Sequence, residues 1–331
     1  MKILVTGGAG FIGSNLTRFL LNREKPQLVI VIDNLSTGRL ENLSSVMDNP
    51  RLKFFHADLT RDFTLIDFVF QRYSPNIIFH LAAEAHVDES IRNPLIASSN
   101  FLMTNVLLEK AREYKVERFI HISTDEVYGP IPTGFADENY PLNPSSPYSA
   151  SKASSDLLCL AYHKTYGVPA IISRCTNNFG PYLDVRRLIA RHITNALLNH
   201  DLPLWDGGGQ MRDWLFVEDH CTALWLLMEK GEPGEIYNIA GGNILRNIEV
   251  AEAILRLIPD SKSKIVFRGS RPAHDIRYAL NADKVKMLGW KPKYGFEEAL
   301  RMTIDWYKEN EGWWMSKKRE IEEKFYGELG R

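Results

Sequence analysis

The sequence contains little cysteine and carries almost no net charge. Three cysteines, Cys159, Cys175 and Cys221, are spread over 331 residues. Their odd number and wide spacing exclude a disulfide framework and a CxxC metal site. The 40 basic and 41 acidic residues leave a net charge of -1, which gives no bulk attraction to nucleic acid or to an anionic membrane. We therefore expect a protein of the reducing cytoplasm.

Long apolar runs, internal repeats and metal-ligand clusters are also missing. No stretch approaches the roughly 20 apolar residues that cross a bilayer. The first residues, Met1-Lys2, lead into a strand pattern without the features of a signal peptide. The histidines are scattered without ligand spacing, so no metal site is expected. The remaining composition, 44% hydrophobic and 24% charged, is that of a globular protein with a large core.

Short apolar runs alternate with helical patterns in the first half of the chain. We expect strands at residues 2–6, 27–32, 53–55, 76–80, 118–122 and 168–173. Helical patterns lie at residues 11–21, 62–72, 95–114 and 148–166. Strands that alternate with helices predict an α/β fold with a Rossmann-type, doubly wound parallel sheet.

Beyond Arg174 the pattern loosens into loops and shorter elements. These are a helix near residues 186–199 and strands near 214–217 and 235–239. We expect residues 1–174 to form the first domain and residues 175–331 to form mainly a smaller lobe, with some segments returning to the first domain. The tail from Glu309 holds two tryptophans and a charged stretch. It predicts a solvated terminal helix with one apolar stripe, with a partner contact as the alternative.

A glycine-rich turn separates the first strand from the first helix. Gly7, Gly10 and Gly13 are spaced Gly-x-x-Gly-x-x-Gly, and Phe11 and Ile12 open the helix. Glycines permit a tight turn and a close approach of the backbone to a pyrophosphate, and the helix N-terminus adds N–H groups and a positive dipole. A turn that only connects strand to helix is the alternative, because this pattern alone is weak evidence.

Acidic and small residues follow the next strands at the same edge of the sheet. Asp33 ends the second strand, where an acid accepts hydrogen bonds from the adenosine ribose diol and repels a 2′-phosphate. The pattern favours NAD over NADP, with Arg39 as the counter-signal, and makes residues 1–174 an NAD-binding domain. The remaining cofactor candidates are Asp58 and Leu59, near the adenine, and Ala82, where the cofactor crosses the sheet edge.

Hydroxyl, carboxyl, phenol and ammonium groups gather in two segments. Ser123-Thr124-Asp125-Glu126 ends the fifth strand, and Tyr148 and Lys152 stand at i and i+4 of a helix, hence on one face. Lys152 and a cationic nicotinamide are expected to lower the pKa of the phenol, so that Tyr148 removes a hydroxyl proton while hydride leaves the same carbon. Thr124 is placed to hydrogen-bond that hydroxyl. An ordinary pair of helix-surface residues is the alternative.

With these residues the chain resembles the extended short-chain dehydrogenase/reductases that act on sugar nucleotides, and within them the dTDP-glucose 4,6-dehydratases. The resemblance covers nearly the whole length. The matching segments are T-G-G-A-G-F-I-G at 6–13, H-L-A-A-E-A-H-V-D at 80–88, S-T-D-E-V-Y-G at 123–129, P-Y-S-A-S-K at 147–152, R-D-W-L-F-V-E-D-H at 212–220 and R-P-A-H-D-I-R-Y at 271–278.

The adjacent acids Asp125 and Glu126 are the specific element of this resemblance. Epimerases of the branch usually carry small or apolar residues there, whereas decarboxylases and GDP-mannose dehydratases usually keep only the Glu. The resemblance implies that, after oxidation at C4 of the hexose, Glu126 removes the C5 proton and Asp125 protonates the departing C6 hydroxyl. Hydride then returns to C6, so the enzyme is a lyase with bound NAD and no net redox change. Crowded acids have pKa values pushed apart, which suits one acid and one base.

A nucleotide diphosphate requires cationic and amide donors in the substrate-binding lobe. Arg212 and Arg271 offer guanidinium groups for bidentate contacts. The resemblance implies that Asn177 and Asn247 contact the diphosphate or nearby groups. Two further candidates, for the sugar hydroxyls, are Glu84 and His86, with a structural histidine as the alternative reading.

One segment departs from the resembled family. Residues 183–188 read L-D-V-R-R-L where the family commonly has Phe-Pro-Glu-Lys-Leu. Arg187 keeps the charge of the Lys and is a candidate substrate ligand, whereas Arg186 reverses the charge of the Glu. Ala273 also stands where the family has Gly. These changes concern the nucleotide end of the site more than the chemistry.

Two other functions stay open at this point. One is a sugar-nucleotide 4-epimerase or a UDP-glucuronate decarboxylase of the same superfamily, and the other is a non-catalytic NAD-binding regulator. The intact Tyr148, Lys152 and acids disfavour the regulator. The resemblance also implies a homodimer, in which the helices at 95–114 and 148–166 form a four-helix bundle with a second copy. The expected partner is a nucleotide sugar of deoxysugar biosynthesis, with neither nucleic acid nor membrane involved.

Overall fold

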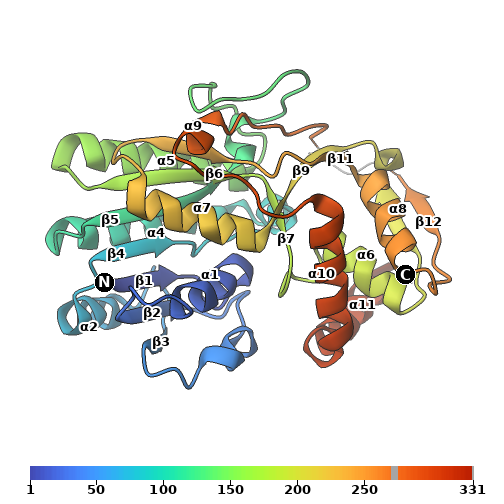
Figure 1. The fold of residues 1–331 in the computed structure, drawn as a ribbon, viewed down its shortest axis with the longest axis horizontal. Helices are drawn as coiled ribbons and strands as arrows, with labels where there is room; N and C mark the ends of the chain where they lie inside the picture. Colours follow the sequence, from blue (N-terminus) through green and yellow to red (C-terminus); the bar gives the residue numbers. More distant parts are fainter. Residues whose placement is uncertain (270–274, 330–331) are drawn as a thin grey trace.

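The computed structural model describes residues 1–269 and 275–329, and of Asp88 and residues 321–329 only the backbone. Its largest element is a seven-stranded parallel sheet with the order β10-β6-β5-β4-β1-β2-β3 (Figure 1). The strands are β1 (Lys2–Thr6), β2 (Leu28–Asp33), β3 (Leu52–His56), β4 (Ile77–His80), β5 (Arg118–Thr124), β6 (Ala170–Cys175) and β10 (Ile236–Ile239). The strand order reverses between β1 and β4, and ligands of such sheets bind at that point.

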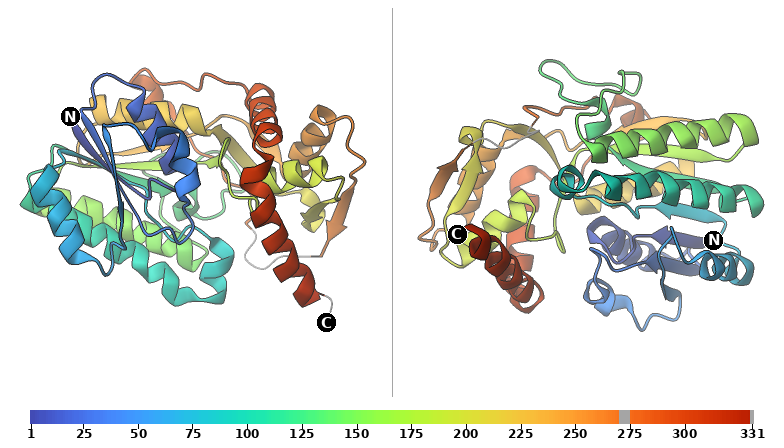
Figure 2. Two further views of the ribbon diagram at one scale, coloured as in Figure 1. Left: turned by 90° about the horizontal axis from the view of Figure 1, so that it is seen from below. Right: turned by 180° about the vertical axis from the view of Figure 1, so that it is seen from behind.

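Helices cover both faces of this sheet (Figure 2). Those on one face are α2 (Phe63–Tyr73), α4 (Pro94–Glu113) and α5 (Pro147–Tyr166), and those on the other are α1 (Phe11–Leu21), the 3-10 helix η1 (Leu40–Val46) and α7 (Val217–Lys230). Each face buries its own apolar cluster, with Leu4 and Ile78 on the first and Val5 and Phe79 on the second. The alternation along β1 and β4 therefore supplies side chains to both layers.

Helix α5 carries two predicted site residues, and local signals fix its ends. The Ser146 side chain accepts a hydrogen bond from the backbone N–H of Ser149 (3.1 Å), and Pro147 occupies the first turn. Such caps satisfy N–H groups that otherwise lack partners in the first turn. Gly167 ends the helix in the left-handed region at φ 72, a conformation that glycine adopts without strain.

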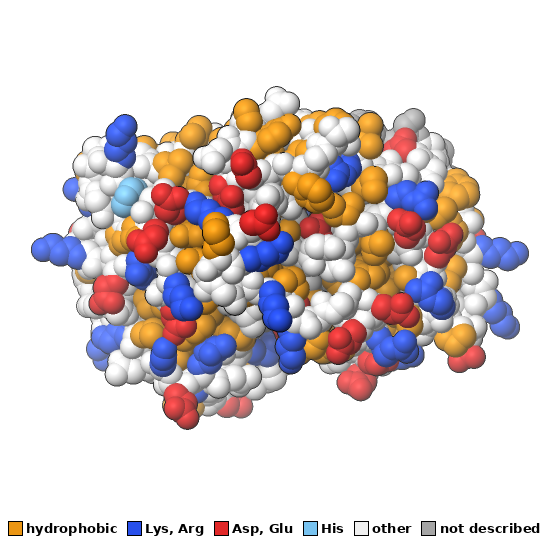
Figure 3. Space-filling model, turned by 45° about the horizontal axis from the view of Figure 1, so that its top comes forward, with side chains coloured by type: hydrophobic (Ala, Val, Ile, Leu, Met, Phe, Trp, Pro, Cys, Tyr) orange, Lys and Arg blue, Asp and Glu red, His pale blue; other side chains and the backbone are white. Residues whose placement is uncertain are grey.

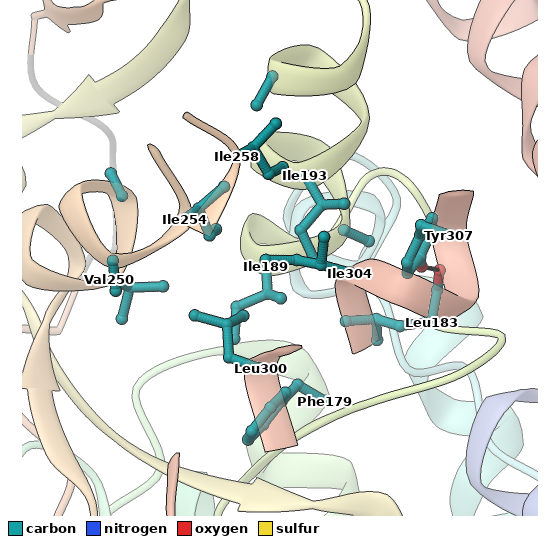
Figure 4. Close-up of a cluster of buried hydrophobic side chains, with 14 of the residues drawn as sticks. Phe179, Leu183, Ile189, Ile193, Val250, Ile254, Ile258, Leu300, Ile304 and Tyr307 are labelled. Atoms are coloured by element: carbon teal, nitrogen blue, oxygen red, sulfur yellow. Dashed lines mark hydrogen bonds between the residues drawn. The ribbon is translucent and has the colours of Figure 1, made fainter. Parts of the chain in front are cut away.

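The C-terminal lobe is built from smaller sheets and helices. Its strands are β7 (Asn177–Phe179), β9 (Met211–Phe216) and β11 (Ile244–Arg246) in one sheet, and β8 (Leu202–Trp205) and β12 (Ile265–Arg268) in another. Its helices are α6 (Leu188–Leu197), α8 (Asn247–Leu257), α10 (Phe296–Glu309) and α11 (Glu311–Leu329). Figure 4 shows Ile189, Ile193, Ile254 and Ile304 pointing toward one another from α6, α8 and α10.

The six strands expected in the first half are present within two residues of their predicted ends. The strand expected near 214–217 runs instead from Met211 to Phe216, because it pairs with β11 from Met211 onward. Although β10 lies beyond residue 175, it joins the large sheet beside β6, and the short helix α9 (Asp283–Met287) lies near it. A short helix α3 (Val87–Arg92), which the sequence did not suggest, follows β4.

The tail is less solvated than its composition suggested. Helix α10 ends at Glu309 and α11 starts at Glu311, so the tail forms one terminal helix, as expected. Trp314 is 2% exposed and belongs to the core of the C-terminal lobe. Its indole N–H donates to the backbone oxygen of Tyr307 (2.8 Å). The first turn of α11 is thus an internal element.

Candidate active site

The glycine turn lies at the switch point of the large sheet, between β1 and α1. Gly7 adopts φ +68, and a Cβ there would lie 2.7 Å from the backbone nitrogen of Ala82. A Cβ on Gly13 would lie 2.1 Å from the carbonyl oxygen of Gly7, so only glycine fits either position. Gly10 is the N-cap of α1, and among the described residues no side chain caps that end. The first N–H groups of α1 are therefore suited to a phosphate.

The carboxylate of Asp33 lies beside this turn. It accepts hydrogen bonds from the backbone N–H groups of Ala9 (2.9 Å) and Leu35 (2.8 Å) and is 6% exposed. Burial raises the pKa of Asp33, and these hydrogen bonds oppose the rise. A Cβ on Gly38 would lie 2.8 Å from Oδ1 of Asp33, so the backbone closes tightly around the acid. The turn, the helix end and this acid fit the pyrophosphate and adenosine ribose of a dinucleotide.

The other predicted cofactor residues differ in how far their side chains are available to a ligand. Phe11 and Ile12 are half-buried at the start of α1, and Phe11 packs against the core of the C-terminal lobe. Ala82 is half-buried beside the turn. Asp58 accepts two hydrogen bonds within its own turn. Leu59 is 2% exposed and packs in the core under the sheet, so any ligand contact falls to its backbone.

Strand β5 ends at Thr124, and the short 3-10 helix η2 (Asp125–Tyr128) follows at once. The Thr124 hydroxyl accepts from the backbone N–H of Glu126 (3.3 Å) and donates to Oδ1 of Asp125 (3.2 Å). Asp125 is 2% exposed, and its Oδ2 has no hydrogen-bond partner within residues 1–269 and 275–329. Burial, and then the charge of Glu126, raise the pKa of Asp125 to about 8. At neutral pH Asp125 is mainly protonated, as a general acid must be.

The phenol and the ammonium of α5 point to the same edge. Lys152 is 3% exposed, and its Nζ donates to the backbone oxygen of Ile122 (2.6 Å). Tyr148 is half-buried, and burial and the charge of Glu126 raise the pKa of its phenol while Arg187 opposes the rise. The sequence predicts a lowering of this pKa by Lys152 together with a cationic nicotinamide, whereas the burial and the Glu126 charge of the chain itself act in the opposite direction. A lower value requires positive charge from the cofactor itself.

A buried charged cluster lies behind Lys152 and was not expected from the sequence. Asp156 accepts from Nε of Arg174 (2.8 Å), and both side chains are buried. His121 Nε2 lies 3.5 Å from Nζ of Lys152 and 3.5 Å from Oδ1 of Asp156. Burial, and then Lys152, lower the pKa of His121 well below its usual value, so the imidazole is neutral. The i, i+4 spacing of Lys152 and Asp156 was the one local signal of this cluster.

Tyr278 and Arg212 bring the C-terminal lobe over the acid pair. The guanidinium of Arg212 lies 4.5 Å from the centre of the Tyr278 ring and donates to the backbone oxygen of Asp275 (2.9 Å). The Tyr278 hydroxyl donates to the Asp275 carboxylate. Burial, and then the charge of Glu126, raise the pKa of Tyr278, which places this phenol near that acid. Sequence reasoning used the segment around Tyr278 only for Arg271 and missed the tyrosine in it.

Glu84 and His86 follow β4, and the segment that departs from the family pattern covers them. Nη2 of Arg186 lies 2.6 Å from Nε2 of His86. Burial, and then Arg187 and Arg186, lower the pKa of His86 to about 3, so the ring is neutral. Arg187 donates to the backbone of the same loop (2.7 Å). Burial raises the pKa of Glu84, and the loop thus offers neutral or weakly acidic groups to a sugar.

The predicted amide ligands carry buried oxygens that lack partners. Asn177 starts β7 and Asn247 starts α8, and the side-chain oxygen of each has no hydrogen-bond partner in the described part of the chain. Buried polar atoms usually find a partner, so these oxygens suit donors on a ligand. Arg271, the remaining predicted substrate residue, lies outside the described residues.

No helix in the described part of the chain is both long and apolar enough to cross a membrane. No group of three or more His, Cys, Asp or Glu residues there is arranged to hold a metal ion. On the face shown in Figure 3, the described acidic and basic side chains are interspersed, in line with the near-zero net charge.

Sequence comparison connects this geometry with known proteins. The family model described as GDP-mannose 4,6 dehydratase matches residues 4–303. Curated dTDP-glucose 4,6-dehydratases from Escherichia coli and from Neisseria meningitidis serogroup B are each 45% identical to this chain, with 95% of the chain and 95% of each relative covered.

Solved structures agree with the fold over almost the whole chain. A dTDP-glucose 4,6-dehydratase from Streptomyces venezuelae, crystallised with NAD and TYD bound, is 42% identical with a TM-score of 0.89, covering 95% of this chain and 99% of that one. A UDP-glucose 4-epimerase from Thermotoga maritima, with UDP-glucose, is 32% identical with a TM-score of 0.88, covering 93% and 99%. The predicted α/β fold with a Rossmann-type sheet is confirmed.

Proposed function

The chain belongs to the GDP-mannose 4,6 dehydratase family, and from this premise we propose that it dehydrates dTDP-glucose to dTDP-4-keto-6-deoxyglucose with NAD as its cofactor. One observation carries the proposal. Two adjacent acids directly follow β5, and the pKa of one of them, Asp125, is raised to about 8. A protonated carboxyl beside a second acid suits the removal of a proton and of a hydroxyl from neighbouring carbons.

The residues at the switch point fit NAD. The Gly7–Gly13 turn and the first N–H groups of α1 receive the pyrophosphate, and Asp33 receives the ribose diol. The chemistry that NAD supplies when bound is reversible acceptance of a hydride. A carboxylate at Asp33 disfavours the additional phosphate of NADP.

Tyr148 takes the proton of the C4 hydroxyl. The hydroxyl of Thr124 shares that edge of the sheet and orients the same group. Lys152, fixed by the carbonyl of Ile122 (2.6 Å), supplies positive charge on the buried side. The phenol pKa, raised by burial and by Glu126, means that Tyr148 holds its proton until the site is filled, and works as a base only against cationic charge.

Glu126 takes the proton from C5, and Asp125 gives its proton to the C6 oxygen, which leaves as water. Support for this division comes from the surroundings of each acid. Asp125 is nearly inaccessible and accepts a hydrogen bond from the Thr124 hydroxyl. Glu126 faces two phenols, Tyr148 and Tyr278, whose pKa values its charge helps to raise. Hydride return to C6, with return of the proton from Glu126 to C5, completes the reaction without net redox change.

The C-terminal lobe binds the nucleotide diphosphate in this proposal. Arg212 and Arg187 bring cationic groups, and Asn177 and Asn247 have amide oxygens that lack partners among the described residues. Glu84 and His86 contact the hexose hydroxyls, since both lie on the loop after β4 at the carboxyl edge of the sheet. Arg271 is assigned to the diphosphate from the sequence motif alone.

The proposal includes a homodimer through α4 and α5. These helices lie side by side on one face of the molecule (Figure 2). Leu95 is 82% exposed, Leu102 41% and Leu157 56%, an amount of exposed apolar surface that favours a helix-to-helix interface. Leu102→Glu combined with Leu157→Glu is expected to give a monomer in sedimentation velocity, and an unchanged molecular mass would remove this part. A cytoplasmic location is also proposed, since all three cysteines are unpaired and buried.

Product masses test the function. The purified protein is incubated with NAD and either dTDP-glucose or UDP-glucose. Loss of one water from dTDP-glucose, with slower or no loss from UDP-glucose, is the expected result. A product of unchanged mass, with C4 inverted by NMR, would indicate epimerase chemistry. In a third incubation with UDP-glucuronate, loss of carbon dioxide would indicate a decarboxylase.

A further inference from the structure

The first turn of α11 reaches across to the cofactor turn. The indole N–H of Trp313 donates to Oδ1 of Asn42 (2.8 Å), and Nδ2 of Asn42 donates to the backbone oxygen of Ala9 (2.7 Å). The N–H of Ala9 donates in turn to Asp33 (2.9 Å). An indole N–H only donates, so it fixes which end of the Asn42 amide faces the turn. Asn42 is 3% exposed, and this chain of hydrogen bonds is shielded from water.

Trp313 also holds Arg39, a cation that could serve a 2′-phosphate. The backbone N–H of Arg39 donates to the oxygen of Ala9 (3.0 Å), and a Cβ on its neighbour Gly38 would lie 2.8 Å from Oδ1 of Asp33. The backbone of Arg39 therefore lies at the ribose edge, where an arginine accommodates the extra phosphate of NADP. Its guanidinium instead donates to the backbone oxygen of Trp313 (3.1 Å) and lies 5.6 Å from the indole ring.

The tryptophan is held firmly in this place. Its ring contacts those of Tyr182 and Trp306, with centroids 5.6 Å and 5.1 Å away, and Arg18 of α1 lies 4.0 Å from the centre of the Tyr182 ring. The next residue, Trp314, is anchored in the core of the C-terminal lobe. Figure 2 shows α11 running along the boundary between the two lobes. Adjacent tryptophans thus attach one helix to both lobes.

We propose that Trp313 is a positioning residue for the adenosine half of the cofactor, which holds the glycine turn through Asn42 and keeps Arg39 turned away from Asp33. The site consequently retains NAD and rejects NADP. This inference rests on the proposed function only in that NAD is the cofactor. A cycle that returns hydride to its own substrate gains from a cofactor that stays bound. Helix α11, near the C-terminus, thereby sets a property of the first domain.

Two substitutions separate the two parts of the role. Trp313→Phe keeps an aromatic ring but removes the indole N–H. The loss of one buried hydrogen bond, about 0.5–1.5 kcal/mol, corresponds to roughly 2- to 13-fold weaker binding of NAD. Trp313→Ala removes the ring that lies beside the Arg39 guanidinium, and leaves that guanidinium held only by the backbone oxygen of residue 313. Arg319→Ala, on an exposed position of the same helix, is the matched control. Trp313→Leu serves in place of the alanine variant if the latter does not fold.

The measurement is cofactor binding without any sugar. Calorimetric titration gives the affinities for NAD and NADP, and displacement by excess unlabelled NAD gives the release rate. We expect Trp313→Phe to release NAD more than twofold faster than the wild type. Trp313→Ala should raise the ratio of NADP to NAD affinity about tenfold or more, and Trp313→Ala with Arg39→Ala should lose that gain.

The inference is overturned if Trp313→Phe releases NAD within twofold of the wild-type rate, or if the NADP-to-NAD ratio does not rise in Trp313→Ala. A ratio that rises equally with and without Arg39 also overturns it. Because these are binding measurements, they stay informative if the sugar chemistry proves different. Failure of the wild-type protein to bind NAD would instead remove the cofactor assignment.

Discussion

Asp125→Asn tests the assignment of the general acid. The amide oxygen still accepts from the Thr124 hydroxyl, and the amide nitrogen takes the place of Oδ2, which has no partner among the described residues. The fold is therefore expected to survive, while the group no longer gives an acidic proton to the leaving hydroxyl. General acid catalysis typically contributes about 10²–10⁴-fold, so kcat for dehydration should fall by about that factor.

The pH profile of the wild type follows from the same group. With a pKa of about 8, about nine-tenths of the molecules hold the Asp125 proton at pH 7 and about one-tenth at pH 9. Turnover of the wild type should therefore fall roughly tenfold for each pH unit above 8. The residual turnover of Asp125→Asn should lack this alkaline limb.

Stability has a matching sign. The pKa of Asp125 is about 8 in the folded protein and about 4 in the unfolded chain. Between these two pH values the folded carboxyl keeps its proton, while the unfolded chain has released it. Over this window the free energy of unfolding falls as pH rises, by about 1.4 kcal/mol per unit for this group. Asp125→Asn removes that slope and should be more stable than the wild type at pH 7.

The assay measures kcat and the free energy of unfolding in urea at several pH values between about 5 and about 9. Asp283→Asn, at an exposed acid whose pKa is lowered by Lys286, is the control and should leave kcat unchanged. If Asp125→Asn keeps kcat within threefold of the wild type, or keeps the alkaline limb, Asp125 is not the acid.

Three further substitutions probe the base, the cofactor turn and the buried cluster. Glu126→Gln should oxidise C4 and then stop, so that NADH absorbance persists in a single turnover; normal decay of that absorbance would exclude Glu126 as the base. Gly13→Ala places a methyl group 2.1 Å from the Gly7 oxygen and should weaken NAD binding at least tenfold by titration, whereas unchanged affinity would show that the turn yields. Asp156→Asn leaves Arg174 buried without its partner and should lower the free energy of unfolding by about 3–5 kcal/mol; an unchanged urea midpoint would contradict the ion pair's role.

Local pattern was enough for the parts of the site that one segment supplies. The glycine turn, Asp33 and the i, i+4 pair of Tyr148 and Lys152 are readable because strand, turn and helix follow one another in the chain. The acid pair at Asp125 was readable for the same reason, since it follows a strand whose carboxyl edge faces the site.

Long-range packing decided the rest. Tyr278 reaches Glu126, and Arg174 reaches Asp156, only after the chain has folded. Burial, which a sequence does not give, raises the pKa of Tyr148 in the chain itself. The sequence placed Trp313 in a solvated tail. Its contact with Asn42, about 270 positions earlier in the chain, cannot be read from local pattern.

Deuterium transfer tests the central claim most directly. The protein is given NAD and dTDP-glucose that carries deuterium at C4, and the product is examined by mass spectrometry and NMR. The account predicts a product that has lost one water and carries the deuterium at C6, because the hydride taken from C4 returns to C6 of the same molecule. A product that keeps the C6 oxygen, or that loses water without deuterium at C6, would contradict it.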